Sequence, residues 1–97
     1  MPTYVTLFRW TQQGIEDVKK SPDRLDKARE LFRQMGGELK AFYLVMGQYD
    51  AVAVGEAPDD ETMARIALAA GARGAVRSET MRAFTEGEYR GIISGLP

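Results

Sequence analysis

The stretch that decides the fold of this chain is Ala41-Phe-Tyr-Leu-Val-Met-Gly-Gln-Tyr-Asp-Ala-Val-Ala-Val54. Two apolar runs flank the tetrapeptide Gly47-Gln48-Tyr49-Asp50, and glycine and aspartate are typical of turns. Two apolar runs joined by such a segment predict a β-hairpin, with strands over residues 38–46 and 51–57. The first strand is apolar on both faces, which is typical of a sheet that is covered on both sides.

The segments on either side of the hairpin predict two more strands and two main helices. Residues 3–10 are aromatic and β-branched, as in a strand, and residues 11–20 are expected to form a loop with one helical turn. Ser21-Pro22-Asp23 marks a helix start with Ser21 as the cap, and Gly36-Gly37 marks its end. A second helix is expected from residue 58 to Gly71 or Gly74, a fourth strand over 75–84, and a short terminal helix or tail over 86–96.

This order of elements predicts an α+β, ferredoxin-like βαββαβ fold in one domain, residues 1–97. Both helices would lie on one face of a four-stranded antiparallel sheet. The other face would then carry a share of Tyr4, Phe8 and Trp10 together with hairpin residues, and a large exposed apolar face usually marks an interaction site. We therefore expect a homodimer with two sheets packed face to face, a dimeric α/β barrel.

Composition excludes several classes of function. The chain contains no cysteine and no histidine, which removes disulfides, thiol nucleophiles, the usual zinc sites, haem ligation by histidine and a histidine base. No metal and no cofactor are expected. The net charge of −1, and the lack of a Lys/Arg-Gly-Phe/Tyr strand motif, argue against a nucleic-acid partner. No secretory signal and no apolar run of roughly 20 residues is present, so we expect a cytoplasmic protein without a membrane partner.

Two groups of aromatic and acidic residues are candidates for a ligand site, and each also has a structural interpretation. Tyr49 and Asp50 could present a phenol and a carboxylate at the mouth of a pocket, or they could serve the hairpin turn. Trp10 and Tyr43, with Tyr4, could line a cavity for an aromatic or lipophilic ligand. They could equally pack in the core or the dimer interface, where aromatic side chains are common.

A third candidate group lies on the fourth predicted strand. Arg77 and Glu79 point to the same face of that strand and could bind an anionic substrate, or they could form an ion pair across the strand or at the rim of the dimer. The acidic run Asp59-Asp60-Glu61 is interpreted as a helix-start device, because no third kind of ligand accompanies it to make a metal site. Glu30 and Arg33 are interpreted as a helix-surface pair.

At Gly47-Gln48-Tyr49-Asp50 the sequence resembles the GYD domain family, small bacterial proteins named for a Gly-x-Tyr-Asp signature. The likeness covers about residues 3–86, and other matching positions follow in family order: Tyr4, Trp10-Thr11, Gly14, Ser21-Pro22, Gly36-Gly37, Phe42-Tyr43, Glu56-Ala57-Pro58-Asp59-Asp60 and Arg77-Ser-Glu-Thr-Met-Arg-Ala-Phe84. The resemblance implies the dimeric α/β-barrel group. The structural neighbours of that group include cofactor-independent monooxygenases, lactone isomerases and haem-dependent enzymes, and the family itself implies no particular activity.

Two functions remain open at this point. The first is a cytoplasmic homodimeric small-ligand-binding or accessory protein. The second is a cofactor-independent enzyme, of isomerase or monooxygenase type, acting on a small aromatic or lipophilic substrate. A sealed interior would favour the first. A pocket with convergent tyrosine or carboxylate groups and shifted pKa values would favour the second.

Overall fold

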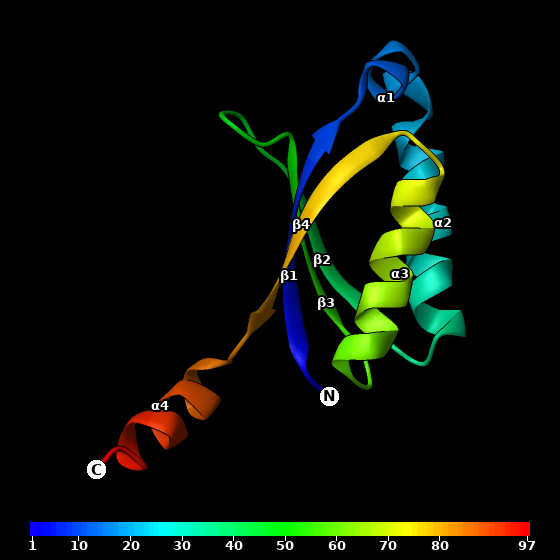
Figure 1. Cartoon of the computed structure of the whole chain (residues 1–97). Coiled ribbons are helices and arrows are strands. Elements are labelled where there is room, and N and C mark those ends of the chain that lie inside the picture. The colour runs from blue at the N-terminus through cyan, green and yellow to red at the C-terminus, as the bar shows by residue number, and fades with distance from the viewer.

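The computed structural model describes all 97 residues and has a four-stranded antiparallel sheet with two long helices on one side (Figure 1). The strands follow the order β2-β3-β1-β4 across the sheet. This is the predicted α+β ferredoxin-like arrangement. The elements in chain order are β1 (Thr3–Trp10), α1 (Gln12–Glu16), a 3₁₀ turn η1 (Val18–Lys20), α2 (Ser21–Gln34), β2 (Glu38–Leu44), β3 (Ala51–Glu56), α3 (Asp60–Ala72), β4 (Val76–Ala83) and α4 (Glu86–Ser94).

The helix boundaries follow from local capping chemistry, with one departure from prediction. Asp59 caps α3 by accepting the Thr62 N–H at 2.8 Å, which confirms the acidic run as a helix start. Gly36 follows α2 with φ +82°, a left-handed conformation that favours glycine. The predicted Ser21 cap was wrong. The turn η1 leads directly into α2, so Ser21 is already the first helical residue and its side chain makes no cap hydrogen bond.

The two faces of the sheet carry different side chains. We call the helix-covered side the inner face and the opposite side the outer face. The outer face has an apolar centre made of Val5, Leu7, Ala41, Tyr43, Val52, Val54 and Met81. The prediction that Tyr4, Phe8 and Trp10 share this outer face was wrong, because all three lie on the inner face. Their bulk fills space that the small β3 residues opposite Tyr4 and Phe8 leave under the helices.

Strand β2 changes phase at Lys40. Leu39 pairs with Gly55 and Ala41 pairs with Val54, so Lys40 is an extra residue in a β-bulge. Sequence alternation places Leu39 on the same face as Ala41. The bulge separates them instead, turning Leu39 into the core while Ala41 stays on the outer face. The predicted alternation along this strand was therefore wrong before the bulge and right after it.

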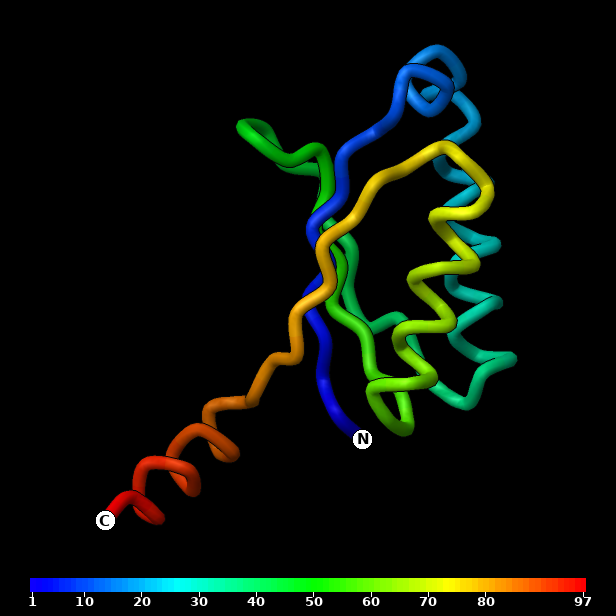
Figure 2. The backbone as a smooth tube through the Cα atoms, viewed as in Figure 1, coloured from blue at the N-terminus to red at the C-terminus, as the bar shows by residue number.

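The core is small, and two segments project from it. Only 12 of the 97 residues are buried, and no large side chain is fully buried. The main cluster consists of Tyr4, Phe32, Leu39, Ala53, Ala57, Met63 and Ile66. Helix α4 and the tip of the β2–β3 hairpin extend away from the body (Figures 1 and 2). The radius of gyration is accordingly 14.5 Å, where a compact chain of this length has about 12.5 Å.

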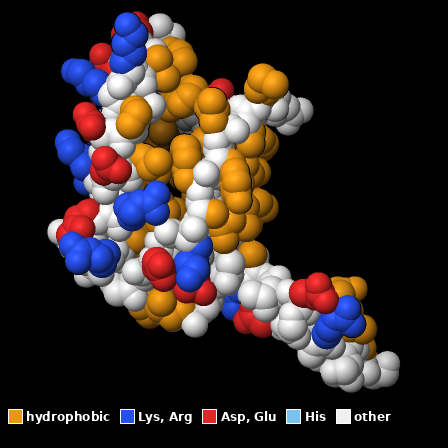
Figure 3. Space-filling view, turned by 180° about the vertical axis from the view of Figure 1, so that it is seen from behind, with side chains coloured by type: hydrophobic (Ala, Val, Ile, Leu, Met, Phe, Trp, Pro, Cys, Tyr) orange, Lys and Arg blue, Asp and Glu red, His pale blue; other side chains and the backbone are white.

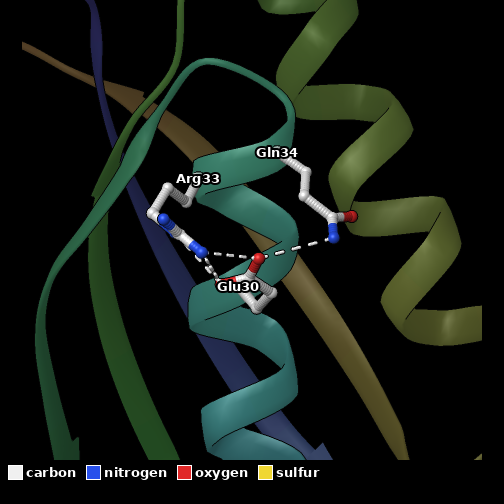
Figure 4. Close-up of polar contacts among 3 residues, drawn as sticks. All are labelled: Glu30, Arg33 and Gln34. Atoms are coloured by element: carbon white, nitrogen blue, oxygen red, sulfur yellow. Dashed lines mark hydrogen bonds and ion pairs between the residues drawn. The ribbon is translucent and has the colours of Figure 1, made fainter.

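The solvent-exposed surface of α2 carries a local polar cluster (Figure 4). Arg33 Nη2 donates to Glu30 Oε2 at 2.6 Å, and Gln34 Nε2 donates to Glu30 Oε1 at 3.5 Å. Both members of the ion pair are exposed, and pairs at this spacing on a helix surface contribute about 0.2–0.5 kcal/mol. The cluster supports the helix and lies outside the candidate site described next.

Candidate functional site

A cavity of about 400 Å³ lies between the inner face of the sheet and helices α2 and α3. In Figure 3 a hollow with apolar walls is visible between the helices and the sheet. The cavity is lined by 27 residues, of which 19 are hydrophobic. Its volume and apolar lining are those of a small-molecule site.

Small side chains on both walls leave this space open. Ala53 and Gly55 line it from β3, and Ala67 and Ala70 line it from α3. Phe32 of α2 lies so close to Gly55 that a Cβ atom there would be 2.6 Å from the phenyl ring. Phe32 therefore fixes the spacing between α2 and the sheet, while the alanines of α3 fill little of the remaining volume.

The polar side-chain groups of the cavity lining are hydroxyls, the indole N–H of Trp10 and two guanidinium groups. Thr6 Oγ1 and Thr80 Oγ1 are 3.1 Å apart and share a hydrogen bond across β1 and β4. Arg24 is half-buried and donates to the backbone oxygens of Gly14 and Asp17, each at 3.2 Å. The lining includes no carboxylate. The cavity can thus hold an apolar body and hydrogen-bond a polar group, but its own walls offer no acid–base pair of carboxylates.

Tyr4 anchors one part of this cavity wall. Its hydroxyl donates to Asp60 Oδ1 at 2.5 Å, which ties β1 to the first turn of α3. Burial, reinforced by this hydrogen bond and by the charge of Asp60, raises the pKa of Tyr4 to about 12. The phenol is therefore protonated at neutral pH and remains a hydrogen-bond donor to Asp60.

The Gly47-Gln48-Tyr49-Asp50 segment forms the hairpin tip and its attachment to the sheet. Gly47 has φ +128°, a conformation that a side chain would strain. Asp50 Oδ2 accepts the backbone N–H of Trp10 at 3.0 Å, so the carboxylate binds β1 and not its own loop. The Tyr49 hydroxyl donates to Glu79 of β4 at 3.1 Å. The segment thereby connects the hairpin to both β1 and β4.

A cation–π contact completes this attachment. The Arg9 guanidinium carbon lies 4.6 Å from the centroid of the Tyr49 ring, and Arg9 Nε donates to the Gln48 backbone oxygen at 2.7 Å. Arg77 lies opposite Arg9 in the β1–β4 register. The structure therefore places Glu79 beside a tyrosine hydroxyl, and it gives Arg77 no ion pair with Glu79.

The six predicted ligand-site residues do not gather at the cavity. Of Trp10, Tyr43, Tyr49, Asp50, Arg77 and Glu79, only Trp10 is part of its lining. Tyr43 is exposed near the hairpin tip, and ligand binding by the other five residues stays a prediction. The lining hydroxyls of Thr6, Ser78 and Thr80 were missed by sequence reasoning. Their signal was the pair of small hydroxyl residues at alternate positions of the fourth strand, 78 and 80.

The structure contains neither a cluster of metal ligands nor a helix that could span a membrane. No three acidic side chains come together in a way that could hold a metal ion. No helix has the length and apolar character required to cross a lipid bilayer.

Comparison with known proteins now assigns the family. The family model of the GYD domain matches residues 4–93. The chain belongs to the GYD domain family. A GYD relative from Thermus thermophilus is 40% identical over 85 residues, spanning 87% of this chain and 90% of the relative. That protein is named "Glutamine synthetase and cystathionine beta-lyase binding protein".

Two solved structures have a similar fold to this GYD chain. A crystal structure of a Thermus thermophilus protein superimposes with a TM-score of 0.55 at 24% identity, covering 88% of this chain and 95% of that one. The de novo designed protein Ferredog-Diesel superimposes with a TM-score of 0.52 at 10% identity, covering 84% and 85%. At these identities the likeness concerns the fold alone.

Proposed function

We propose that this GYD chain is a cytoplasmic homodimeric binding protein that serves as an accessory to enzymes and holds a small apolar ligand in each protomer. In the dimer, the two sheets would pack outer face to outer face. The observation that carries the proposal is the set of large apolar side chains that one protomer leaves exposed, which include Tyr43, Met46, Met81, Ile92 and Ile93. A binding protein needs such a surface, whereas a monomeric enzyme with its site in the cavity does not.

The accessible surface supports pairing quantitatively. One protomer exposes 6647 Å², whereas a compact monomer of 10.8 kDa exposes about 5,500 Å². The excess of about 1,100 Å² reflects the two segments that project from the body, and each partner of a stable interface buries roughly 800 Å². The apolar centre of the outer face and the exposed apolar side chains of the two projecting segments both contribute to this surface.

Sedimentation equilibrium at micromolar concentration tests the pairing. We expect a species of twice the 10.8 kDa chain mass. A clean monomer at that concentration would refute the dimer.

The accessory role is supported by the Thermus relative. Because that protein is named for binding two enzymes, and the alignment spans nearly the whole of both chains, we infer that this chain also binds an enzyme. The test is to mix the purified dimer with glutamine synthetase and with cystathionine beta-lyase from the same organism, and to measure co-sedimentation. We expect a complex with at least one of them. Free sedimentation of every component would contradict the accessory role.

The ligand part of the proposal is tested with a neutral aromatic probe, 1-aminoanthracene. Ala67 lines the cavity from α3, so Ala67→Phe should fill it and weaken probe binding at least tenfold. Ala64 lies on the exposed side of the same helix and outside the lining, so Ala64→Phe is the matched control and should leave binding unchanged. Equal affinities for the two variants would place the probe elsewhere and refute the cavity as the site.

The enzymatic alternative has less support in the geometry. Catalysis without a cofactor requires acid or base groups that reach the substrate. The cavity lining carries no carboxylate, and the Tyr4 phenol is already engaged by Asp60.

A further inference from the structure

Helix α4 has an apolar face that nothing in its own chain covers. Its apolar residues Tyr89, Ile92 and Ile93 follow the helical spacing i, i+3 and i+4, and Leu96, just beyond the end of the helix, continues the spacing at i+7. Each is between 47% and 63% exposed. Gly91 falls on the opposite side of the helix. Figures 1 and 2 show no other element of the chain beside α4.

A helix of this length needs a partner. Isolated helices shorter than about 12–15 residues are marginal in water, and α4 has nine. Its start is well capped, because Thr85 and Glu88 form a reciprocal capping box and Arg90 pairs with Glu86 at 3.0 Å. Such local devices contribute little each, so packing of the apolar face must supply the remaining stability.

The second uncovered apolar segment is the tip of the β2–β3 hairpin. At the tip itself Met46 is 98% exposed, and at the end of β2 beside it Tyr43 on the outer face and Leu44 on the inner face are 61% and 69% exposed. No residue from 41 to 46 carries a charge, so this part of the hairpin matches an apolar helix face in chemistry, while the Arg9 guanidinium lies against Gln48 and Tyr49 beside it. Figure 1 shows that the hairpin tip and α4 project to the same side of the sheet, away from α2 and α3, and from opposite ends of it.

This placement has a geometric consequence for a symmetric dimer. A two-fold axis that lies along the outer face and across the strands exchanges the two ends of the sheet. It would bring the hairpin of one protomer to the end of the sheet from which α4 of the other protomer extends. We propose that α4 of each protomer packs its apolar face against the β2–β3 hairpin tip of the other, so that the two chains clasp each other at both ends of the interface.

This inference rests on the proposed function, because it requires the two outer faces to be paired. It adds a specific occupant for each projecting segment, a second copy of this chain. The two contacts would be continuous with the sheet-to-sheet interface and identical by symmetry.

Cross-linking tests the contact directly, because the natural chain has no cysteine to react. The variant carrying both Met46→Cys and Ile93→Cys would be treated with a short bis-maleimide at low micromolar concentration. We expect a covalent dimer on denaturing gels. The matched control carries Met46→Cys with Gly91→Cys, which places the second thiol on the opposite side of α4. Its yield of covalent dimer should be at least fivefold lower.

The outcomes separate this inference from the proposed dimer. Sedimentation of the same double variant before treatment reports the oligomeric state. A dimer that gives no cross-link, or that gives equal yields for the Ile93→Cys and Gly91→Cys pairs, overturns the clasp and leaves the sheet pairing intact. A link within one chain overturns the clasp by showing that α4 folds back on its own hairpin. A monomer overturns both.

Discussion

The inner and outer faces of the sheet differ in how their apolar side chains are covered. The inner face is covered by α2 and α3, yet the cover is loose and leaves a cavity of about 400 Å³. The outer face is apolar at its centre, and its own chain supplies no cover. The difference indicates that the two faces bind different kinds of partner. Space under the helices suits a small ligand, while an exposed apolar centre on the outer face suits another protein molecule.

The largest effect of a substitution, on folding stability, is expected on the inner face. Phe32 is 7% exposed and joins α2 to the sheet at Gly55. We expect Phe32→Ala to lower the free energy of unfolding by about 3 kcal/mol, near the lower end for buried phenylalanines because the adjacent cavity already limits packing. Urea denaturation measures this loss. Leu68→Ala, at a position 74% exposed on α3, should change stability by less than about 0.5 kcal/mol.

On the outer face, a buried charge should break the dimer without unfolding the protomer. Val5 lies on a central strand between Val54 and Met81, so Val5→Glu would place a carboxylate at the centre of the proposed interface. We expect the dimer to dissociate about 100-fold more readily, equivalent to about 2.7 kcal/mol. Sedimentation equilibrium measures it. Leu68→Glu makes the same kind of change on the helix side and should leave the dimer intact; a loss there would argue for a different interface.

A smaller effect is expected where the hairpin is attached at the end of the sheet. Asp50→Ala removes the acceptor for the Trp10 N–H and should lower the melting temperature, at a cost of about 1–2 kcal/mol. Probe binding in the cavity should change little, because Asp50 is not part of the lining. An unchanged melt with lost binding would instead favour Asp50 as a ligand residue. Asp50→Asn keeps an acceptor oxygen, so its melting temperature should lie between that of the natural protein and that of Asp50→Ala.

The last effect is seen only at alkaline pH and concerns the inner face. The folded state raises the pKa of Tyr4 from 10.0 to about 12. The folded protein therefore holds this proton more tightly than the unfolded chain, so the associated stability is complete below pH 10 and is lost as pH rises toward 12. Tyr4→Phe should remove this part of the alkaline slope. Denaturation of both proteins across that range measures it, and parallel curves would contradict the assignment.

Much of the fold could be predicted because local patterns and the global arrangement agree. The turn residues at 47–50 predicted the hairpin, Asp59 predicted the start of α3, and Gly36 predicted the end of α2. The face of β1 could not be predicted. Its side chains are apolar in both directions, so alternation alone does not tell which set meets the helices.

The candidate site was harder to predict for a related reason. The Tyr49 and Asp50 side chains are conspicuous in the sequence, and they make hydrogen bonds to Glu79 and Trp10. The cavity is made mostly by what is missing, the side-chain volume at Ala53, Ala67 and Ala70. Empty volume depends on the distance between helix and sheet, and no local pattern encodes that distance.

The bulge at Lys40 sets the phase of everything that follows it on β2. Because one additional residue reverses the direction of each later side chain, the bulge lets a single strand supply Leu39 to the core and Tyr43 to the opposite surface. Inserting or deleting one residue at this point would move every later side chain of β2 to the opposite face of the sheet. The length of the strand, as well as its composition, therefore determines which surface the tip of the hairpin offers to a neighbour.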